Sequence, residues 1–500
     1  MAESRALSSQ PQPRYRPNVL ILLCDQLQRD FVGAYGHPLA HTPNIDRLAA
    51  SGVKLAHAYV PKPQCAPARA SMFTGRYPHQ HQLMMNNAAI TWQTPVGPLA
   101  NRPALPESVP SLGQAFQAAG YRLGYTGPWH MGNDETPQHG FTDFWRTYRY
   151  WKDGRDYYVQ YLEELGLDQL FHDEHQRANM ARAARTDHAQ PSMATQIPTE
   201  HTRTAWAVSQ TLEFLDSADP RPWLFCCSIK DPHPPVLPPP EFADLVSPDD
   251  VRFVPSWVDD LSDKPALQRD SASVRWTSYM TDDQWRQYIA HYHGLNAHID
   301  TEVGRLLQGL DRRGLTGNTL VIFLSDHGEM MGSHRMAHKG PYMYEDVYAI
   351  PFIAHWPGHI EGGRTHPDLF STVDFAATLG ALTGVPVDGG AGLDQSALLT
   401  HGQPGPRDAI YAEFYGQGSE AERGLMAIKS IRTRDWKLNI YLSDRSELYH
   451  LATDPHEHTN LIDHPDYEST RRELGERIVN WLRETDDPLI DVFAAEIAST

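Results

Sequence analysis

The sequence has 500 residues, with 43 lysine and arginine residues against 62 aspartate and glutamate residues, so its formal net charge is −19. This acidic balance disfavours a general nucleic-acid or anionic-membrane binder, because such proteins present a basic face to phosphate groups. The apolar content of 40% and the aromatic content of 10% exclude a disordered or fibrous chain, and the length predicts roughly two to four domains.

We expect no signal peptide at the beginning of the chain. Residues 1–16 are polar and proline-containing, so we expect a flexible tail without the apolar stretch of a signal peptide. The apolar run at 19–24 is too short to span a membrane. The four cysteines are too few to cross-link this chain, and Cys226 and Cys227 are adjacent in an apolar run. These features predict a cytoplasmic protein without disulfide bonds.

Continuous apolar runs indicate the central strands. The runs at 18–24, 222–229 and 319–325 are typical of strands buried on both faces of a sheet, and a weaker run lies at 121–126. Between the last two long runs, apolar residues recur at three- and four-residue steps over 292–310, which predicts an amphipathic helix. Alternating strands and helices predict an α/β fold.

The second half of the chain predicts a smaller subdomain. Residues 184–198 are polar and aperiodic, which predicts a loop or mobile insertion, and the glycine- and proline-rich segment 384–406 predicts a linker. Beyond it, 408–451 is typical of short strands and 467–482 of a closing helix. We therefore predict a main domain over 17–400 and a C-terminal α+β subdomain over 401–500, with short antiparallel strands and a closing helix.

Polar residues follow the predicted strands directly. They are Asp25, Gln26, His130, His233, Asp326 and His327. Because the ligand crevice of an open α/β sheet lies at the carboxyl ends of its strands, we expect these side chains around one site. A lone aspartate after a strand is commonly a turn or cap residue, which is the alternative at each single position. Several such strand ends together favour a site.

Part of this group is suited to a metal ion. Asp25, Gln26, Asp326 and His327 offer two carboxylates, an amide oxygen and an imidazole. Such oxygen-rich sets suit Ca²⁺ or Mg²⁺, and the imidazole also suits Mn²⁺. Helix caps and turns remain the alternative role for the aspartates.

Cys65 begins a predicted helix. Pro67 fits its first turn and Gly75 fits a stop just past its end. Arg69, one turn further on, adds a cation to the positive end of the helix dipole, so an anion would be stabilised there. The alternative role of an isolated cysteine, a small buried hydrophobe, fits the polar flanking residues poorly. A thiol phosphatase loop would need arginine where this chain has Ser71.

The segment Cys65-Ala-Pro-Ala-Arg69 resembles the Cys-x-Pro-x-Arg motif of type I sulfatases. Further segments are similar to sulfatase blocks in the same order: 17–20, 42–48, 325–328, 338–340, 350–353, 447–455 and 460–461. The resemblance spans most of the chain, which makes it far more specific than one short motif. It implies an alkaline phosphatase-like fold with a central mixed sheet flanked by helices, and hydrolysis of sulfate monoesters to alcohol and sulfate.

The resemblance also implies a nucleophile and a metal site. A formylglycine-generating (sulfatase-maturing) enzyme would oxidise Cys65 to formylglycine. One hydroxyl of the hydrated aldehyde would attack sulfur, and the other would expel sulfate afterwards. One divalent cation, Ca²⁺ or alternatively Mn²⁺, would be bound by Asp25, Gln26, Cys65, Asp326 and His327.

Further roles follow from the same resemblance. Arg69 would steady the diol, and His130 would assist elimination of sulfate. His233 and Lys339 would bind the oxyanion and protonate the leaving oxygen. Asn86 or Asn87 would add a hydrogen bond.

Two positions depart from the sulfatase pattern. Gln26 stands where sulfatases commonly carry a second aspartate, and a neutral ligand should weaken Ca²⁺ binding and favour Mn²⁺. Pro128 stands where many sulfatases have a lysine that contacts the sulfate, so oxyanion binding would depend more on Lys339, Arg69 and the metal. Both departures resemble phosphonate monoester hydrolases, and the Asp25-Gln26 pair is also similar to choline sulfatases.

Two alternative functions therefore stay open. One is a phosphonate monoester or phosphodiester hydrolase with the same nucleophile. The other is a non-catalytic family member that binds sulfated ligands or partners, against which the complete set of site residues speaks. The acidic surface favours small sulfate esters over long sulfated glycans, because it would repel large polyanions.

Overall fold

The computed structural model describes residues 16–86, 89–132, 137–147, 156–184, 192–416, 425–442 and 444–500. Asn87, nearly all of the predicted tail 1–16 and part of the predicted loop 184–198 therefore lie outside the described residues.

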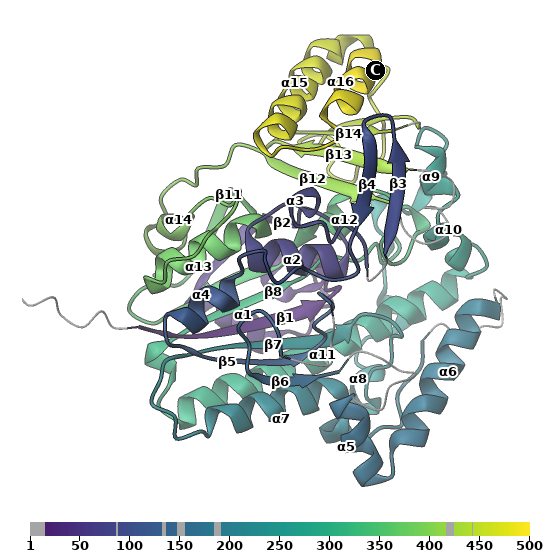
Figure 1. Ribbon diagram of the computed structural model, residues 1–500. Helices are drawn as coiled ribbons and strands as arrows, with labels where there is room; N and C mark the ends of the chain where they lie inside the picture. The colour runs from purple at the N-terminus through teal and green to yellow at the C-terminus, as the bar shows by residue number, and fades with distance from the viewer. Residues whose placement is uncertain are drawn as a thin grey trace, which may run out of the picture.

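Within these ranges, a nine-stranded mixed sheet forms the centre of the molecule (Figure 1). Its order is β11-β2-β10-β8-β1-β7-β5-β6, with β9 paired to β2. β1 runs parallel to β7 and β8, and β5 runs parallel to β7 and β6, whereas β10 is antiparallel to β8 and β2. The strands are β1 (Asn18–Asp25), β2 (Val53–Tyr59), β5 (Arg122–Gly127), β6 (Asp143–Arg146), β7 (Trp223–Pro232), β8 (Thr319–Ser325), β9 (Ala349–Ile350), β10 (Phe352–His355) and β11 (Arg364–Ser371).

The predicted apolar runs form the middle of this sheet because both of its faces are covered. In β1, Leu20 and Leu22 point into one hydrophobic core and Val19 and Ile21 point into the other. A strand buried on both faces needs apolar residues at every position, which is why these runs do not alternate. The predicted α/β class, with a central mixed sheet flanked by helices, is confirmed.

Helices cover each face of the sheet (Figure 1). One face packs against α1 (Pro43–Ser51), α7 (Arg203–Leu215) and α11 (Asp282–Arg312). The other face packs against α2 (Cys65–Thr74), α4 (Leu112–Ala118), α13 (Phe375–Thr383) and α14 (Ser396–His401). The predicted helix over 292–310 is confirmed as part of the longer α11. It begins earlier because Thr281 and Gln284 form a capping box.

The C-terminal part contains a four-stranded antiparallel sheet in the order β12-β13-β14-β15. Its strands are β12 (Ile410–Tyr415), β13 (Ala427–Arg432), β14 (Trp436–Tyr441) and β15 (Glu447–His450). The predicted closing helix is present as α15 (Glu468–Glu484), and α16 (Ile490–Ser499) follows it (yellow in Figure 1). The division at residue 400 stays a prediction.

The interpretation of 384–406 as a linker is wrong. Helix α14 lies within it, and its residues Leu398 and Leu399 are buried in the main core. The glycines serve close packing: a Cβ on Gly75, which ends α2 at φ +67°, would meet the Gly389 carbonyl oxygen at 2.0 Å. The backbone N–H of Ala391 donates to the Gly75 carbonyl at 2.8 Å.

The remaining described elements are short or peripheral. They are the hairpin of β3 (Ile90–Thr94) and β4 (Gly97–Asn101), and α3 (Pro78–His81), α5 (Tyr157–Leu165), α6 (Asp168–Ala184), α8 (Pro240–Ala243), α9 (Ala266–Arg269), α10 (Ala272–Thr277) and α12 (Glu345–Tyr348). No helix in the described ranges combines the length and apolar character needed to cross a bilayer. For the site, the important fact is that β1, β5, β7 and β8 are parallel, so their carboxyl ends meet at one edge.

Candidate active site

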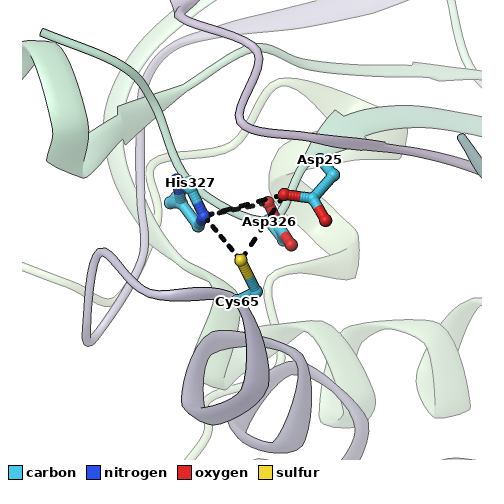
Figure 2. Close-up of side chains that lie close together, drawn as sticks. All are labelled: Asp25, Cys65, Asp326 and His327. Atoms are coloured by element: carbon cyan, nitrogen blue, oxygen red, sulfur yellow. Dashed lines mark hydrogen bonds and ion pairs between the residues drawn. The ribbon is translucent and has the colours of Figure 1, made fainter. Parts of the chain in front are cut away.

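Four of the predicted site residues converge at this edge (Figure 2). Asp25 ends β1, Asp326 and His327 follow β8, and Cys65 is the first residue of α2. Their ligand-capable atoms all lie within 4.8 Å of one another, and all four residues are buried. The Cys65 Sγ lies 3.5 Å from the Asp25 Oδ1 and 3.1 Å from the His327 Nε2. The structure thus brings together residues up to 302 positions apart along the chain (327 − 25).

Cys65 is held at the start of its helix by local sequence. Helix α2 begins at Cys65 and ends before Gly75, as predicted from Pro67 and Gly75. The Oδ1 of Asn86 accepts a hydrogen bond from the backbone N–H of Ala66 at 3.0 Å. Asn86 therefore satisfies one of the free N–H groups at the helix start, directly beside Cys65.

The Cys65 side chain is an unreactive thiol in this environment. Burial raises the pKa of Cys65 to about 12, and the neighbouring Asp25 carboxylate adds to the effect. Because the thiolate is the nucleophilic form, a free Cys65 is poorly suited to attack an ester at neutral pH.

His327 is oriented for a cation. Its Nδ1 donates to the Gly328 carbonyl at 2.8 Å, because a carbonyl oxygen can only accept. The Nε2 of the neutral ring therefore carries the lone pair, and it lies 3.6 Å from the Asp326 Oδ1 and 3.9 Å from the Asp25 Oδ1. A lone pair directed at carboxylate oxygens gains nothing by itself, whereas a divalent cation would bind all three groups. The donor set fits the predicted cation.

Gln26 is fixed at both ends of its amide. Its backbone has φ +71°, the left-handed region that is costly for a non-glycine residue, and its N–H donates to the Asp326 Oδ1 at 3.0 Å. The Nε2 donates to Glu329, and the Oε1 accepts from Lys339. These two contacts identify the amide atom beside Lys339 as the oxygen Oε1. An amide oxygen can bind a metal cation, whereas the amide nitrogen cannot.

Glu329 supplies a negative charge beside Gln26. Although burial opposes ionisation, hydrogen bonds and the nearby His338 lower the pKa of Glu329 to about 2. Sulfatases commonly carry an aspartate at the position of Gln26. In this chain the Glu329 carboxylate, which accepts a hydrogen bond from Gln26, provides a negative charge next to this position.

Arg69 contacts the carboxylates of both Asp25 and Asp326. Its Nε donates to the Asp326 Oδ2 at 2.7 Å, and its Nη2 lies 3.4 Å from the Asp25 Oδ2. Its Nη1 donates to the Tyr125 hydroxyl at 3.2 Å, the Ser228 Oγ at 2.8 Å and the carbonyl of Pro128. The guanidinium is completely buried, so it fixes the positions of both acids.

His130 is a buried residue close to the charged side chains of Asp25 and Arg69. It is 2% exposed, and its backbone is left-handed at φ +61°. Burial lowers the pKa of His130 well below 6.5, and the charges of Asp25, Arg69 and Lys230 also act on the ring. His130 is therefore a neutral imidazole near Asp25.

His233 directly follows β7, the strand that pairs with β1. Its Nδ1 donates to the Pro234 carbonyl at 2.7 Å, which leaves the Nε2 as the acceptor of the neutral ring. Burial, followed by the positive charges of Lys230 and Lys339, lowers the pKa of His233 well below 6.5. The ring can take up a proton at Nε2 and can donate it again.

Two residues of the site escaped the sequence interpretation. Lys230, at the end of β7, has its Nζ 3.8 Å from the Asp25 Oδ2, and burial lowers its pKa to about 8. It stands three residues before His233, so its place after a buried strand was a usable signal. Glu329 gave no such signal, because its contact with Gln26 depends on the loop after β8.

Comparison with known proteins gives two family matches. The model of the sulfatase family matches residues 17–385. The model described as the C-terminal part of N-sulphoglucosamine sulphohydrolase matches residues 332–484.

Individual relatives cover nearly the whole chain. The chain is 28% identical over 492 residues to an uncharacterized sulfatase of Escherichia coli (strain K12), covering 95% of this chain and 88% of the relative. It is 26% identical over 479 residues to an arylsulfatase of Clostridium perfringens, covering 90% and 91%. The crystal structure of a phosphonate monoester hydrolase of Agrobacterium radiobacter aligns with a TM-score of 0.76 at 25% identity, covering 94% of this chain and 96% of that one.

Proposed function

This chain belongs to the sulfatase family and is a sulfuric ester hydrolase, and from that premise we propose that it hydrolyses sulfate monoesters of small alcohols with a nucleophile derived from Cys65. The observation that carries the proposal is the position of the Cys65 Sγ, 3.5 Å from the Asp25 Oδ1 and 3.1 Å from the His327 Nε2. A buried, protonated thiol there is a weak nucleophile. We therefore propose that a formylglycine-generating enzyme converts Cys65 to formylglycine, whose hydrate supplies an oxygen nucleophile.

The metal site would hold one divalent cation. Its ligands would be Asp25, Gln26, residue 65, Asp326 and His327, and the oxygen-rich set favours Ca²⁺, with Mn²⁺ as the alternative. When bound, such a cation screens the negative charge of the sulfate ester and lowers the pKa of the attacking hydroxyl. Arg69 keeps Asp25 and Asp326 in place through its contacts with both carboxylates.

The remaining residues move protons and bind oxygens. His130 is neutral, so it can accept the proton released when sulfate is eliminated. Lys339, whose ammonium contacts the Gln26 Oε1, would protonate the leaving alcohol oxygen and bind the sulfate. His233 would share this role through its Nε2, since its Nδ1 is engaged with Pro234. The two hydroxyls of the hydrate would release two protons in a full cycle, of which one is returned to the alcohol oxygen and one leaves to solvent. Hydrolysis by water thus gives the alcohol, sulfate and one proton, and water restores the hydrate.

A second candidate function is the hydrolysis of phosphonate monoesters or phosphodiesters at the same site. The alignment with the phosphonate monoester hydrolase structure supports it, as do Gln26 and Pro128 at the two departing positions. Family membership alone does not separate these ester classes, because both present a small anionic group to the same cluster.

The test combines a peptide mass with a substrate panel. Protein purified from its native host should give a Cys65 peptide lighter than the cysteine form. Turnover of an aryl sulfate, an aryl phosphonate monoester and an aryl phosphodiester with one common leaving group should be highest for the sulfate. A Cys65→Ala variant should stay folded and lose turnover. An unshifted mass in active protein would refute the nucleophile, a phosphonate preference would select the second candidate, and inactivity toward all three esters would favour a binding protein.

A further inference from the structure

Lys230 brings a buried ammonium group into the site with its donors unused. Its side chain is 4% exposed, and no described atom accepts a hydrogen bond from its Nζ. The Asp25 Oδ2, at 3.8 Å, lies beyond hydrogen-bond distance. An ammonium has three donors, and leaving them all unmatched in the interior is costly. Such a group indicates a ligand that arrives later.

The other two cations of the site already donate hydrogen bonds, although the Arg69 Nη2 donates none. Arg69 uses its Nε and Nη1 on Asp326, Tyr125, Ser228 and Pro128. Lys339 donates to the Gln26 Oε1. Of these three cations, Lys230 alone makes no hydrogen bond to any described residue.

The surroundings of Lys230 suit an anion next to Cys65. Its Nζ lies 3.8 Å from the Asp25 Oδ2, and the Asp25 Oδ1 lies 3.5 Å from the Cys65 Sγ. Together with His233 and Arg203 it also lines a small cavity of about 50 Å³. Asp25 presents its Oδ2 to Lys230 and its Oδ1 to Cys65, and so it lies between the ammonium and the sulfur.

We propose that Lys230 binds a non-bridging oxygen of the sulfuryl group and so supplies the cation that position 128 lacks. This inference rests on the proposed function. A charge-assisted hydrogen bond from a fixed, buried ammonium stabilises the charge that develops on the sulfuryl oxygens during transfer. The competing role is structural, with Lys230 acting only as a counter-ion for Asp25.

Inorganic sulfate is the probe that separates the two roles. We compare the wild type with Lys230→Met and Lys230→Arg, and measure the inhibition constant for sulfate, the KM and kcat for an aryl sulfate, the metal content and the Tm. Lys230→Met should raise the inhibition constant and the KM about tenfold or more, with metal content and Tm maintained. Lys230→Arg should restore part of the sulfate affinity, because it keeps the charge. If Lys230→Met fails to fold, Lys230→Gln replaces it under the same criteria.

Lys54→Met is the matched control. It removes the same charge from β2, where the Lys54 ammonium donates to the Ala34 carbonyl outside the site, and it should leave the sulfate affinity unchanged. An unchanged inhibition constant in Lys230→Met would overturn the inference, most plainly if metal content or Tm falls instead. A wild-type enzyme that neither hydrolyses sulfate esters nor binds sulfate would overturn the proposed function, and the inference with it.

Discussion

Two buried clusters of this protein both combine acidic residues with a histidine, but they differ in how many of their polar atoms form hydrogen bonds. In the active site, Asp25, Asp326, His327 and Cys65 lie within 4.8 Å of one another. In the C-terminal part, the acids Glu413 and Asp487 enclose His79 with the same compactness. By composition alone, either group could hold a metal ion.

In the C-terminal cluster, the polar side chains form hydrogen bonds with one another. Lys429 donates to Glu413 and Asp487, and to the Tyr415 hydroxyl at 2.9 Å. His79 donates to Glu413 from both its backbone N–H, at 2.7 Å, and its Nδ1. The Lys429 ammonium and the His79 Nδ1 thus already supply hydrogen bonds to these acids, so the carboxylates are satisfied without a metal ion.

The active-site cluster leaves polar atoms over. The Asp25 Oδ2, the Arg69 Nη2 and the Lys230 Nζ are buried without a hydrogen bond in the described part of the chain. Native interiors rarely tolerate such atoms unless a ligand completes them. The degree of satisfaction, more than residue type, therefore separates a functional cluster from a structural one.

The structural cluster is also connected to the segment that precedes Cys65. The Glu413 backbone N–H donates to the Pro61 carbonyl at 2.8 Å. The Lys62 ammonium is completely buried and donates to the carbonyls of Met84 and Tyr415. The C-terminal sheet therefore contacts and fixes the segment that leads into Cys65.

The largest expected effect is on stability, in the structural cluster. Glu413→Gln should lower the free energy of unfolding by about 3–5 kcal/mol, because it leaves buried cations without their counter-charge. Turnover per folded molecule should stay at the wild-type level. Urea denaturation and kcat normalised to the folded fraction test both expectations. Lost turnover at unchanged stability would place Glu413 in the catalytic machinery and break the comparison.

Lys339→Met should instead lose turnover while keeping its stability. Its kcat should fall about a hundredfold or more, because the proposed proton donor to the leaving oxygen is lost. Its Tm should change little, since the side chain is half-buried. The loss should grow along a series of aryl sulfates as the pKa of the leaving phenol rises, which separates proton donation from simple charge attraction. A uniform loss along the series would contradict the role of general acid.

Much of the fold could be predicted from the sequence, for identifiable reasons. The strand at 319–325 was predicted with the bounds of β8, because a strand buried on both faces has no polar positions. Pro67 and Gly75 marked both ends of α2 through their fixed backbone preferences. The glycine-rich stretch 384–406 was misinterpreted as a linker, because composition does not distinguish flexibility from the close backbone packing of Gly389 on Gly75.

The site was predictable only in part. Asp25, Asp326 and His327 could be placed together because parallel strands share one carboxyl edge. The contact of Glu329 with Gln26, and the missing hydrogen bonds of Lys230, depend on loops whose course the sequence pattern does not determine. The role of Gln26 therefore became interpretable only when its partner was known.

Glu329→Gln should have an intermediate effect, on metal affinity. Removing the carboxylate that holds the Gln26 Nε2 should lower the affinity for a divalent cation about 10- to 100-fold, since partners of ligands orient them. Adding Gln26→Glu in the same background returns the lost charge to position 26 and should recover affinity. Calorimetric titration of the metal-free variants tests both steps. Equal affinities in wild type and Glu329→Gln would show that Gln26 needs no such partner.

The smallest expected effect is a pH dependence of stability in a second ion network of the C-terminal part. Lys437 contacts both Glu345, at 2.8 Å, and Glu457, at 2.7 Å, so one ammonium serves two carboxyl groups. Burial raises the pKa of Glu457 to about 7, even though Lys437 opposes the shift, and the neighbouring Glu345 adds to it. Arg432 and the Tyr59 hydroxyl also contact Glu345, which therefore keeps its charge.

The direction of this pH dependence follows from the pKa of Glu457 in the folded and in the unfolded chain. In the unfolded chain Glu457 loses its proton near its ordinary pKa of about 4.3, whereas the folded protein keeps that proton up to about pH 7. The Glu457 contribution to stability is therefore complete below about pH 4 and decreases as the pH rises through this window. Glu457→Gln removes the titration, so its urea midpoint should fall less than that of the wild type between about pH 5 and 8. Parallel curves for the two proteins would show that Glu457 is ionised throughout, and that this network is as fully paired as the one around Lys429.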